Sequence, residues 1–156
     1  MRPALLGALL LTACTGSVDR KPAETAVPDI GSTTFSPSLG IELSAMTRTP
    51  RGVYLRELSP GTGAPAGPGQ QVAIHYQGSL ANGQPFDANG PMDPPFVFRL
   101  GAGEVVPGFD EGVTGMRAGG RRQLIIPPAL GYGAQPNGPI PPNSILVFTI
   151  ELVRVQ

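Results

Sequence analysis

Three side chains with acid, base or nucleophile chemistry lie close together in the chain: His75, Ser79 and Asp87. These are the residue types of a hydrolase triad, in which a histidine accepts the proton of a serine. A nucleophilic serine of that kind stands in a Gly-x-Ser-x-Gly turn, and nothing of this form surrounds Ser79. His75 is the only histidine, and alternation along a strand places it on the face opposite to Tyr76. We therefore reject the triad and interpret His75 as a packed, hydrogen-bonded structural residue.

The glycine-rich and basic segments do not indicate a nucleotide or nucleic-acid site. The motif Leu100-Gly-Ala-Gly103 lacks the third glycine and the lysine of a phosphate-binding loop, so it predicts a turn between a strand and a helix. Eleven acidic residues balance eleven basic ones, and the longest basic run is Arg121-Arg122. This charge pattern predicts that nucleic acid is not a partner.

The beginning of the chain resembles a bacterial lipoprotein signal. Arg2 precedes an apolar run over residues 4–11, which is too short to span a bilayer but long enough for the apolar region of a signal peptide. The run ends in Leu11-Thr-Ala-Cys14, and Cys14 is the only cysteine. We expect residues 1–13 to be a signal peptide and Cys14 to be lipidated, anchoring the protein to the lipid bilayer of a bacterial cell envelope. The alternatives are a free thiol beside an ordinary signal or a mis-assigned start codon.

The following segment has the composition of a linker. Residues 14–49 are rich in Ser, Thr, Pro and Gly, with isolated apolar residues and no sustained period of 3.6 or 2. Such a segment buries too little apolar surface to fold alone, so we expect a flexible tether. The segment also contains a small group of apolar residues at 39–43, and the sequence does not decide whether this part of the tether packs on the domain.

Residues 50–156 predict one α+β domain. Apolar and polar residues alternate in five segments: 53–57, 72–76, 96–100, 122–126 and 145–155. The pair Asn82-Gly83 is a strong turn signal. A single helix is expected from Pro107, because proline suits a helix start and Phe109, Val113 and Met116 then share one face. The expected architecture is a curved antiparallel sheet of about five strands around one short helix.

A set of short motifs in this region resembles the FKBP-type peptidyl-prolyl cis/trans isomerases. The resemblance runs from about residue 52 to residue 155, with one single-residue length change near residues 135–139. It rests on Val72-Ala-Ile-His-Tyr-Gln-Gly78, Phe86-Asp87, Phe96-Val-Phe98, Glu104-Val-Val-Pro-Gly-Phe109, Tyr132-Gly-Ala, Ile140-Pro-Pro and Leu146-Val-Phe148. The family implies a pocket between the helix and the concave face of the sheet.

The resemblance implies a role for eleven residues. Asp87 and Tyr132 would be catalytic, Asp87 through its carboxylate facing the twisted amide and Tyr132 through its phenol. Glu104 would offer its main-chain carbonyl and Ile140 its backbone N–H. The substrate-binding residues would be Tyr76, Phe86, Phe96, Glu104, Val105, Val106, Phe109, Ile140 and Phe148.

The residues taken singly allow plainer interpretations. Aromatic residues at strand spacing also form ordinary cores, Tyr132 also fits an exposed loop, and Asp87 also fits the cap of a turn. Two positions depart from the family pattern: Met92 stands where well-known eukaryotic members have an arginine that pairs with the pocket aspartate, and Phe109 replaces a common tryptophan.

The function implied is rotation of Xaa-Pro peptide bonds in exported proteins. The amide barrier is about 18–20 kcal/mol, and lowering it by binding the twisted amide requires no metal or cofactor. Expected partners are proline-containing polypeptides and macrolide ligands, and a monomer is expected. The alternative is a weakly catalytic proline-binding adaptor on the membrane surface, which Met92 and Phe109 would favour.

Overall fold

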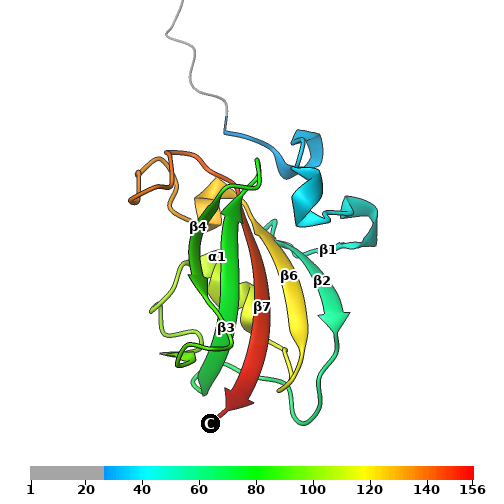
Figure 1. The fold of residues 1–156 in the computed structure, drawn as a ribbon, viewed down its shortest axis with the longest axis vertical. Helices are drawn as coiled ribbons and strands as arrows, with labels where there is room; N and C mark the ends of the chain where they lie inside the picture. Colours follow the sequence, from blue (N-terminus) through cyan, green and yellow to red (C-terminus); the bar gives the residue numbers. More distant parts are fainter. Residues whose placement is uncertain (1–26) are drawn as a thin grey trace, which may run out of the picture.

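The computed structural model describes residues 27–156, which form one antiparallel sheet with a short helix behind it (Figure 1). The strand order is β1-β2-β6-β7-β3-β4, and β5 pairs with the first half of β3, next to β4. The strands are β1 (Thr47–Arg48), β2 (Tyr54–Ser59), β3 (Gln71–Leu80), β4 (Pro85–Asn89), β5 (Phe96–Arg99), β6 (Arg121–Ile126) and β7 (Leu146–Val155). The expected α+β class is confirmed, with seven strands in place of about five.

All five segments with alternating residues are strands, and two further strands have no such signal. β1 contains two residues, and β4 is exposed or half-buried along its whole length, so neither shows an apolar face. The turn predicted at Asn82-Gly83 joins β3 to β4. Gly83 has a φ of 89°, and the N–H of Leu80 donates to the carbonyl of Gln84 across the turn at 2.9 Å.

The helix α1 (Pro107–Val113) begins at the predicted proline. Phe109, Val113 and Met116 are all buried, but the helix ends at Val113, because Thr114 leaves the helical conformation with a ψ of 130°. Gly108 and Gly112 let α1 approach the sheet closely. A Cβ on Gly108 would lie 2.4 Å from Ile126 of β6, and one on Gly112 would lie 2.2 Å from Leu124. Short residues on the helix thus set the depth at which Phe109 enters the core.

The end of α1 is held by a buried arginine of β6. Both Nε and Nη2 of Arg122 donate to Oε2 of Glu57, at 2.9 and 2.7 Å. Its Nη1 donates to the carbonyl oxygens of Gly112 and Thr114, at 2.9 and 3.0 Å. One side chain therefore connects β2, β6 and the last turn of the helix.

Residues 30–46, here called the N-terminal arm, pack on the sheet face opposite to α1. The arm contains three single-turn 3-10 helices: η1 (Ile30–Ser32), η2 (Pro37–Leu39) and η3 (Leu43–Ala45). Its apolar side chains join Ile125, Ile145 and Val147 in a second apolar cluster, in which Ile30 is 4% exposed. Gln123 Nε2 donates to the carbonyl of Leu39 at 2.8 Å. This packing corrects the expectation of a flexible tether for these residues, because apolar side chains on both faces of β7 need a cover on each side.

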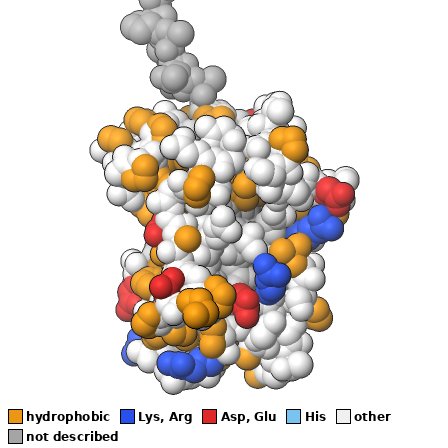
Figure 2. All heavy atoms as spheres, viewed as in Figure 1, with side chains coloured by type: hydrophobic (Ala, Val, Ile, Leu, Met, Phe, Trp, Pro, Cys, Tyr) orange, Lys and Arg blue, Asp and Glu red, His pale blue; other side chains and the backbone are white. Residues whose placement is uncertain are grey.

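The face opposite to α1 carries charges of both signs. Figure 2 shows acidic and basic side chains lying near each other on it, and Arg56 and Glu42 form one such pair at 3.0 Å between β2 and the arm. His75 of β3 lies on this face, where its Nδ1 is 2.9 Å from Asn89 Oδ1. The predicted hydrogen bonding of His75 is confirmed, and its structural role stays a prediction. No helix within residues 27–156 is long and apolar enough to cross a membrane.

Candidate active site

A cavity of about 280 Å³ lies between α1 and the concave face of the sheet, and the predicted site residues surround it. Tyr76 reaches it from β3, Phe96 from β5, Phe109 from α1 and Phe148 from β7. The full lining is Tyr76, Phe86, Asp87, Phe96, Glu104, Val105, Val106, Phe109, Tyr132 and Phe148. Every residue predicted for the site except Ile140 is in this set.

The floor of the cavity is a group of aromatic rings packed edge to face. The rings of Phe109 and Phe148 have centroids 4.9 Å apart at 86°, and those of Tyr76 and Phe109 are 6.1 Å apart at 83°. Phe109 and Phe148 are only 5% and 6% exposed. Edge-to-face contacts place the positive ring edge against the negative ring face, which fixes the ring orientations. The result is a slot with a buried apolar floor that suits a small apolar ring.

Asp87 is at the rim, where its Oδ2 accepts a hydrogen bond of 2.8 Å from the Tyr76 hydroxyl. Burial, together with this hydrogen bond and the charge of Asp87, raises the pKa of Tyr76 to about 12. The phenol is therefore protonated at neutral pH and remains a donor to the carboxylate. Asp87 lies within β4 and caps no turn; Met92 is 96% exposed, and no ion pair of Asp87 occurs within residues 27–156.

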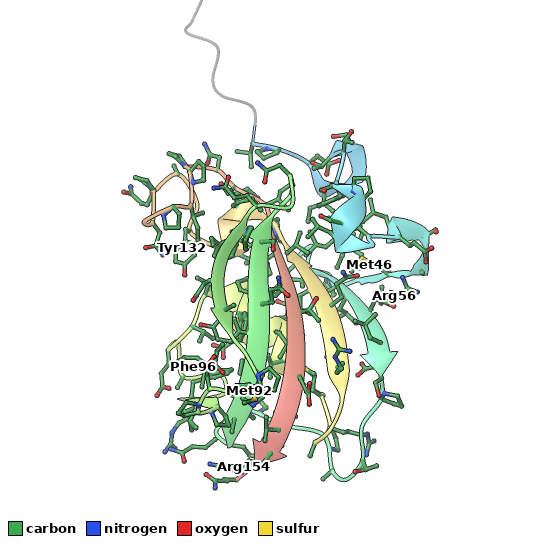
Figure 3. All side chains as sticks on the ribbon, in the orientation of Figure 1. Met46, Arg56, Met92, Phe96, Tyr132 and Arg154 are labelled. Atoms are coloured by element: carbon green, nitrogen blue, oxygen red, sulfur yellow. The ribbon has the colours of Figure 1, made fainter. Side chains whose placement is uncertain are left out.

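Tyr132 and Phe96 line the cavity from different segments of the chain. Tyr132 comes from the loop after η4 (Pro128–Leu130) and is 37% exposed, while Phe96 begins β5 and is 38% exposed. Figure 3 shows both on the same side of the sheet, away from Met46 of the arm. The partly exposed phenol of Tyr132 is accessible to a ligand entering the slot.

Ile140 differs from its expected place. Its side chain is 3% exposed within the main core, and its N–H donates to the carbonyl of Asn137 at 2.9 Å. That N–H is used inside the turn and is not offered to a ligand. Val106 is a better donor: it lines the cavity at the N-cap of α1, and its N–H has no partner among residues 27–156.

Glu104 and Gly78 support the walls of the site. The Glu104 carboxylate accepts from the backbone N–H of Arg99 at 2.8 Å, so its charge holds the loop before α1, and its carbonyl role stays a prediction. Gly78 was not assigned a role from the sequence. A Cβ there would lie 2.7 Å from the rings of both Phe86 and Phe148, so glycine is needed for these rings to close over β3. A glycine inside a strand pattern is the signal that could have identified this close approach from the sequence.

The chemistry available in the cavity is binding and electrostatics. The lining has two acidic residues, Asp87 and Glu104, two phenols and a free backbone N–H around apolar rings, and it has no serine, cysteine, lysine or histidine. Among residues 27–156, no three His, Cys, Asp or Glu side chains gather as metal ligands would.

Comparison with known proteins assigns the fold and site to a family. The family model described as FKBP-type peptidyl-prolyl cis-trans isomerase matches residues 63–153. The chain is 42% identical over 105 residues to "FK506-binding protein" of Neisseria meningitidis serogroup B, covering 67% of this chain and 96% of that protein. It is 47% identical over 110 residues to "FK506-binding protein 4" of Mycosarcoma maydis, covering 70% of this chain and 29% of that protein.

A solved structure has the same fold. The crystal structure of FkpA from Escherichia coli aligns with a TM-score of 0.68 at 33% identity, covering 77% of this chain and 55% of that one. The chain spans less than a third of the length of several curated relatives that it matches. The protein belongs to the FKBP-type peptidyl-prolyl cis-trans isomerase family.

Proposed function

We propose that this protein catalyses cis/trans rotation of Xaa-Pro peptide bonds. The observation that carries the proposal is the aromatic slot, which has Asp87 and Tyr132 at its rim and no nucleophile in its lining. Rotation makes and breaks no covalent bond, so an enzyme needs only to bind the twisted amide better than the planar one. Lowering the barrier by about 5 kcal/mol accelerates the reaction a few thousand-fold.

Each part of the slot has a task in this reaction. The aromatic rings of Tyr76, Phe109 and Phe148 hold the proline ring and exclude water from the bond that rotates. A twisted amide loses resonance, so its carbonyl carbon is more electron-poor and is stabilised by the nearby Asp87 carboxylate. The Tyr132 phenol and the Val106 N–H donate to carbonyl oxygens of the substrate and fix the backbone on each side of the proline.

The direct test is exchange of an Ala-Xaa-Pro-Phe peptide, followed by NMR or by a protease-coupled assay. We expect acceleration well above the uncatalysed exchange, which takes tens of seconds or longer. Tight binding of the peptide or of a macrolide without acceleration would instead support the adaptor function, which the lack of an ion pair for Asp87 within residues 27–156 favours.

Tyr132→Phe should lower kcat/KM by about two- to tenfold, because it removes one hydrogen bond worth about 0.5–1.5 kcal/mol net. The substitution keeps the ring, so the slot retains its shape. The same peptide exchange assay measures it. A variant without any loss would show that the phenol does not contact the substrate.

We propose further that the protein acts on exported polypeptides while anchored in a bacterial cell envelope. The support is the signal-like run over residues 4–11 followed by Cys14, all of which lie outside the described residues. A lipidated Cys14 carrying two or more acyl chains would hold the domain on a bilayer, since one chain alone binds only marginally.

Cys14→Ser should move the protein from the membrane fraction to the soluble fraction without changing its isomerase activity. The reason is that the lipid would be attached far along the chain from the slot. Fractionation followed by immunoblotting measures the first effect, and the peptide assay measures the second. Equal membrane association of both forms would contradict the lipoprotein proposal.

A further inference from the structure

The N-terminal arm meets two segments that lead to the candidate catalytic residues. One is the β3–β4 turn at residues 81–84, which precedes Asp87, and the other is the loop at residues 131–145, which carries Tyr132. Figure 1 shows the arm, the turn and this loop together at the same end of the sheet. The arm lies outside the region matched by the family model.

A backbone hydrogen bond ties the arm to the turn. The N–H of Ser36 donates to the carbonyl of Ala81 at 2.8 Å. A Cβ on Gly83 would lie 2.8 Å from the Ser38 hydroxyl and 2.9 Å from the Ser36 hydroxyl, so the two segments are in close contact. The chain continues from this turn into β4, where Asp87 is only four residues beyond Gly83.

An apolar contact ties the arm to the end of the Tyr132 loop. Ile30 and Ile145 are each 4% exposed and belong to the same cluster. The three segments also surround one surface cavity of about 250 Å³, lined by Pro28, Thr33, Leu80, Ala81, Asn82, Ser144 and Ile145. No residue of the arm lines the catalytic slot.

We propose that the N-terminal arm is a positioning element of the active site, holding the β3–β4 turn and the Tyr132 loop in fixed relation. The inference rests on the proposed isomerase function of Asp87 and Tyr132. Both side chains must stay close to their productive positions, since small displacements of catalytic groups are costly in rate. Turns and loops are the segments that open most readily, and the arm covers both on their outer side.

The pair Ser36→Pro and Ser36→Ala isolates the hydrogen bond to Ala81. Ser36 has a φ of −59°, which proline adopts without strain, and Ser36→Pro removes the N–H whereas Ser36→Ala keeps it. We expect Ser36→Pro to lower kcat about fivefold relative to Ser36→Ala, the effect of one lost hydrogen bond, with KM within about twofold because the slot is intact. Amide hydrogen exchange at residues 80–88 should be faster in Ser36→Pro and unchanged in Ser36→Ala.

A second pair tests the contact with the Tyr132 loop. Ile30→Ala and Ile41→Ala remove the same atoms from the same cluster, but Ile41 lies between η2 and η3 and does not line the cavity that the arm shares with the turn and the loop. Both variants should lose stability, and we expect only Ile30→Ala to lose kcat at a temperature where each is folded. Ile30→Val should restore most of it.

Two results would overturn the proposal: equal kcat and equal exchange in the Ser36 pair, or equal loss of kcat in the Ile30→Ala and Ile41→Ala variants. A failure of the proposed isomerase function would look different. The wild type would then not accelerate peptide exchange, while hydrogen exchange at residues 80–88 would still report whether the arm holds the turn.

Discussion

Asp87→Leu should lower kcat/KM for a proline peptide by about 30-fold, more than any other substitution in the slot that keeps the fold. Two losses combine in this variant. The negative charge that faces the twisted amide disappears, and the Tyr76 hydroxyl loses the acceptor at 2.8 Å. Before substrate binds, the Asp87 carboxylate is exposed to solvent, which screens its charge. Substrate covers it on binding, and this limits the screening during the reaction.

Asp87→Asn is the matched control for this prediction. Its side-chain oxygen still accepts from Tyr76, so only the charge is lost. We expect a decrease of about tenfold, on the reasoning that the charge is the larger part of the effect. Full activity of Asp87→Asn beside a weak Asp87→Leu would assign Asp87 to orienting Tyr76. Full activity of both folded variants would remove Asp87 from the mechanism.

Arg122→Leu should lower the free energy of unfolding by about 3 kcal/mol, the largest stability effect expected for a polar residue here. The side chain is 10% exposed, and it donates to Glu57 and to two carbonyl oxygens at the end of α1. Leucine fills similar space but leaves those oxygens without a donor. Phe109 of the slot floor is in α1. Losing the hydrogen bonds at the end of this helix therefore removes part of the support for the floor. Denaturation in urea, monitored by circular dichroism, measures the change.

Arg121→Leu provides the comparison, because Arg121 is the neighbouring arginine at the exposed start of the same strand. An exposed substitution of this kind changes stability by at most about 0.5 kcal/mol. Similar losses in both variants would mean that the hydrogen bonds of Arg122 contribute little and that the strand responds only to a change of charge.

Because the arm packs on the sheet, the N-terminal part of this protein is connected to the candidate site through direct contacts. A flexible linker up to residue 49 would leave the catalytic domain independent of whatever precedes it. In the structure the packed unit starts near Ile30, and Ser36 and Ile30 contact segments that lead to Asp87 and Tyr132.

The amino-acid sequence by itself determined the main strands, the β3–β4 turn and the start of the helix. These features have local causes. Alternation along a strand follows from its two faces, Asn82-Gly83 supplies the backbone conformation that the turn needs, and proline is suited to the start of α1. The slot residues were predicted from the resemblance of their motifs to the FKBP family, and no local pattern in the chain identifies them without it.

The tertiary structure alone decided the features that depend on partners distant in the chain. β4 has no apolar face, and it is a strand because β3 offers it an unpaired edge. The N–H of Ile140 donates to the carbonyl of Asn137, whereas the N–H of Val106 has no partner among residues 27–156. The arm has no apolar period, yet it packs because Ile125, Ile145 and Val147 present a second apolar face of the sheet. Burial and hydrogen bonding of these groups are shared between distant segments, so no local pattern records them.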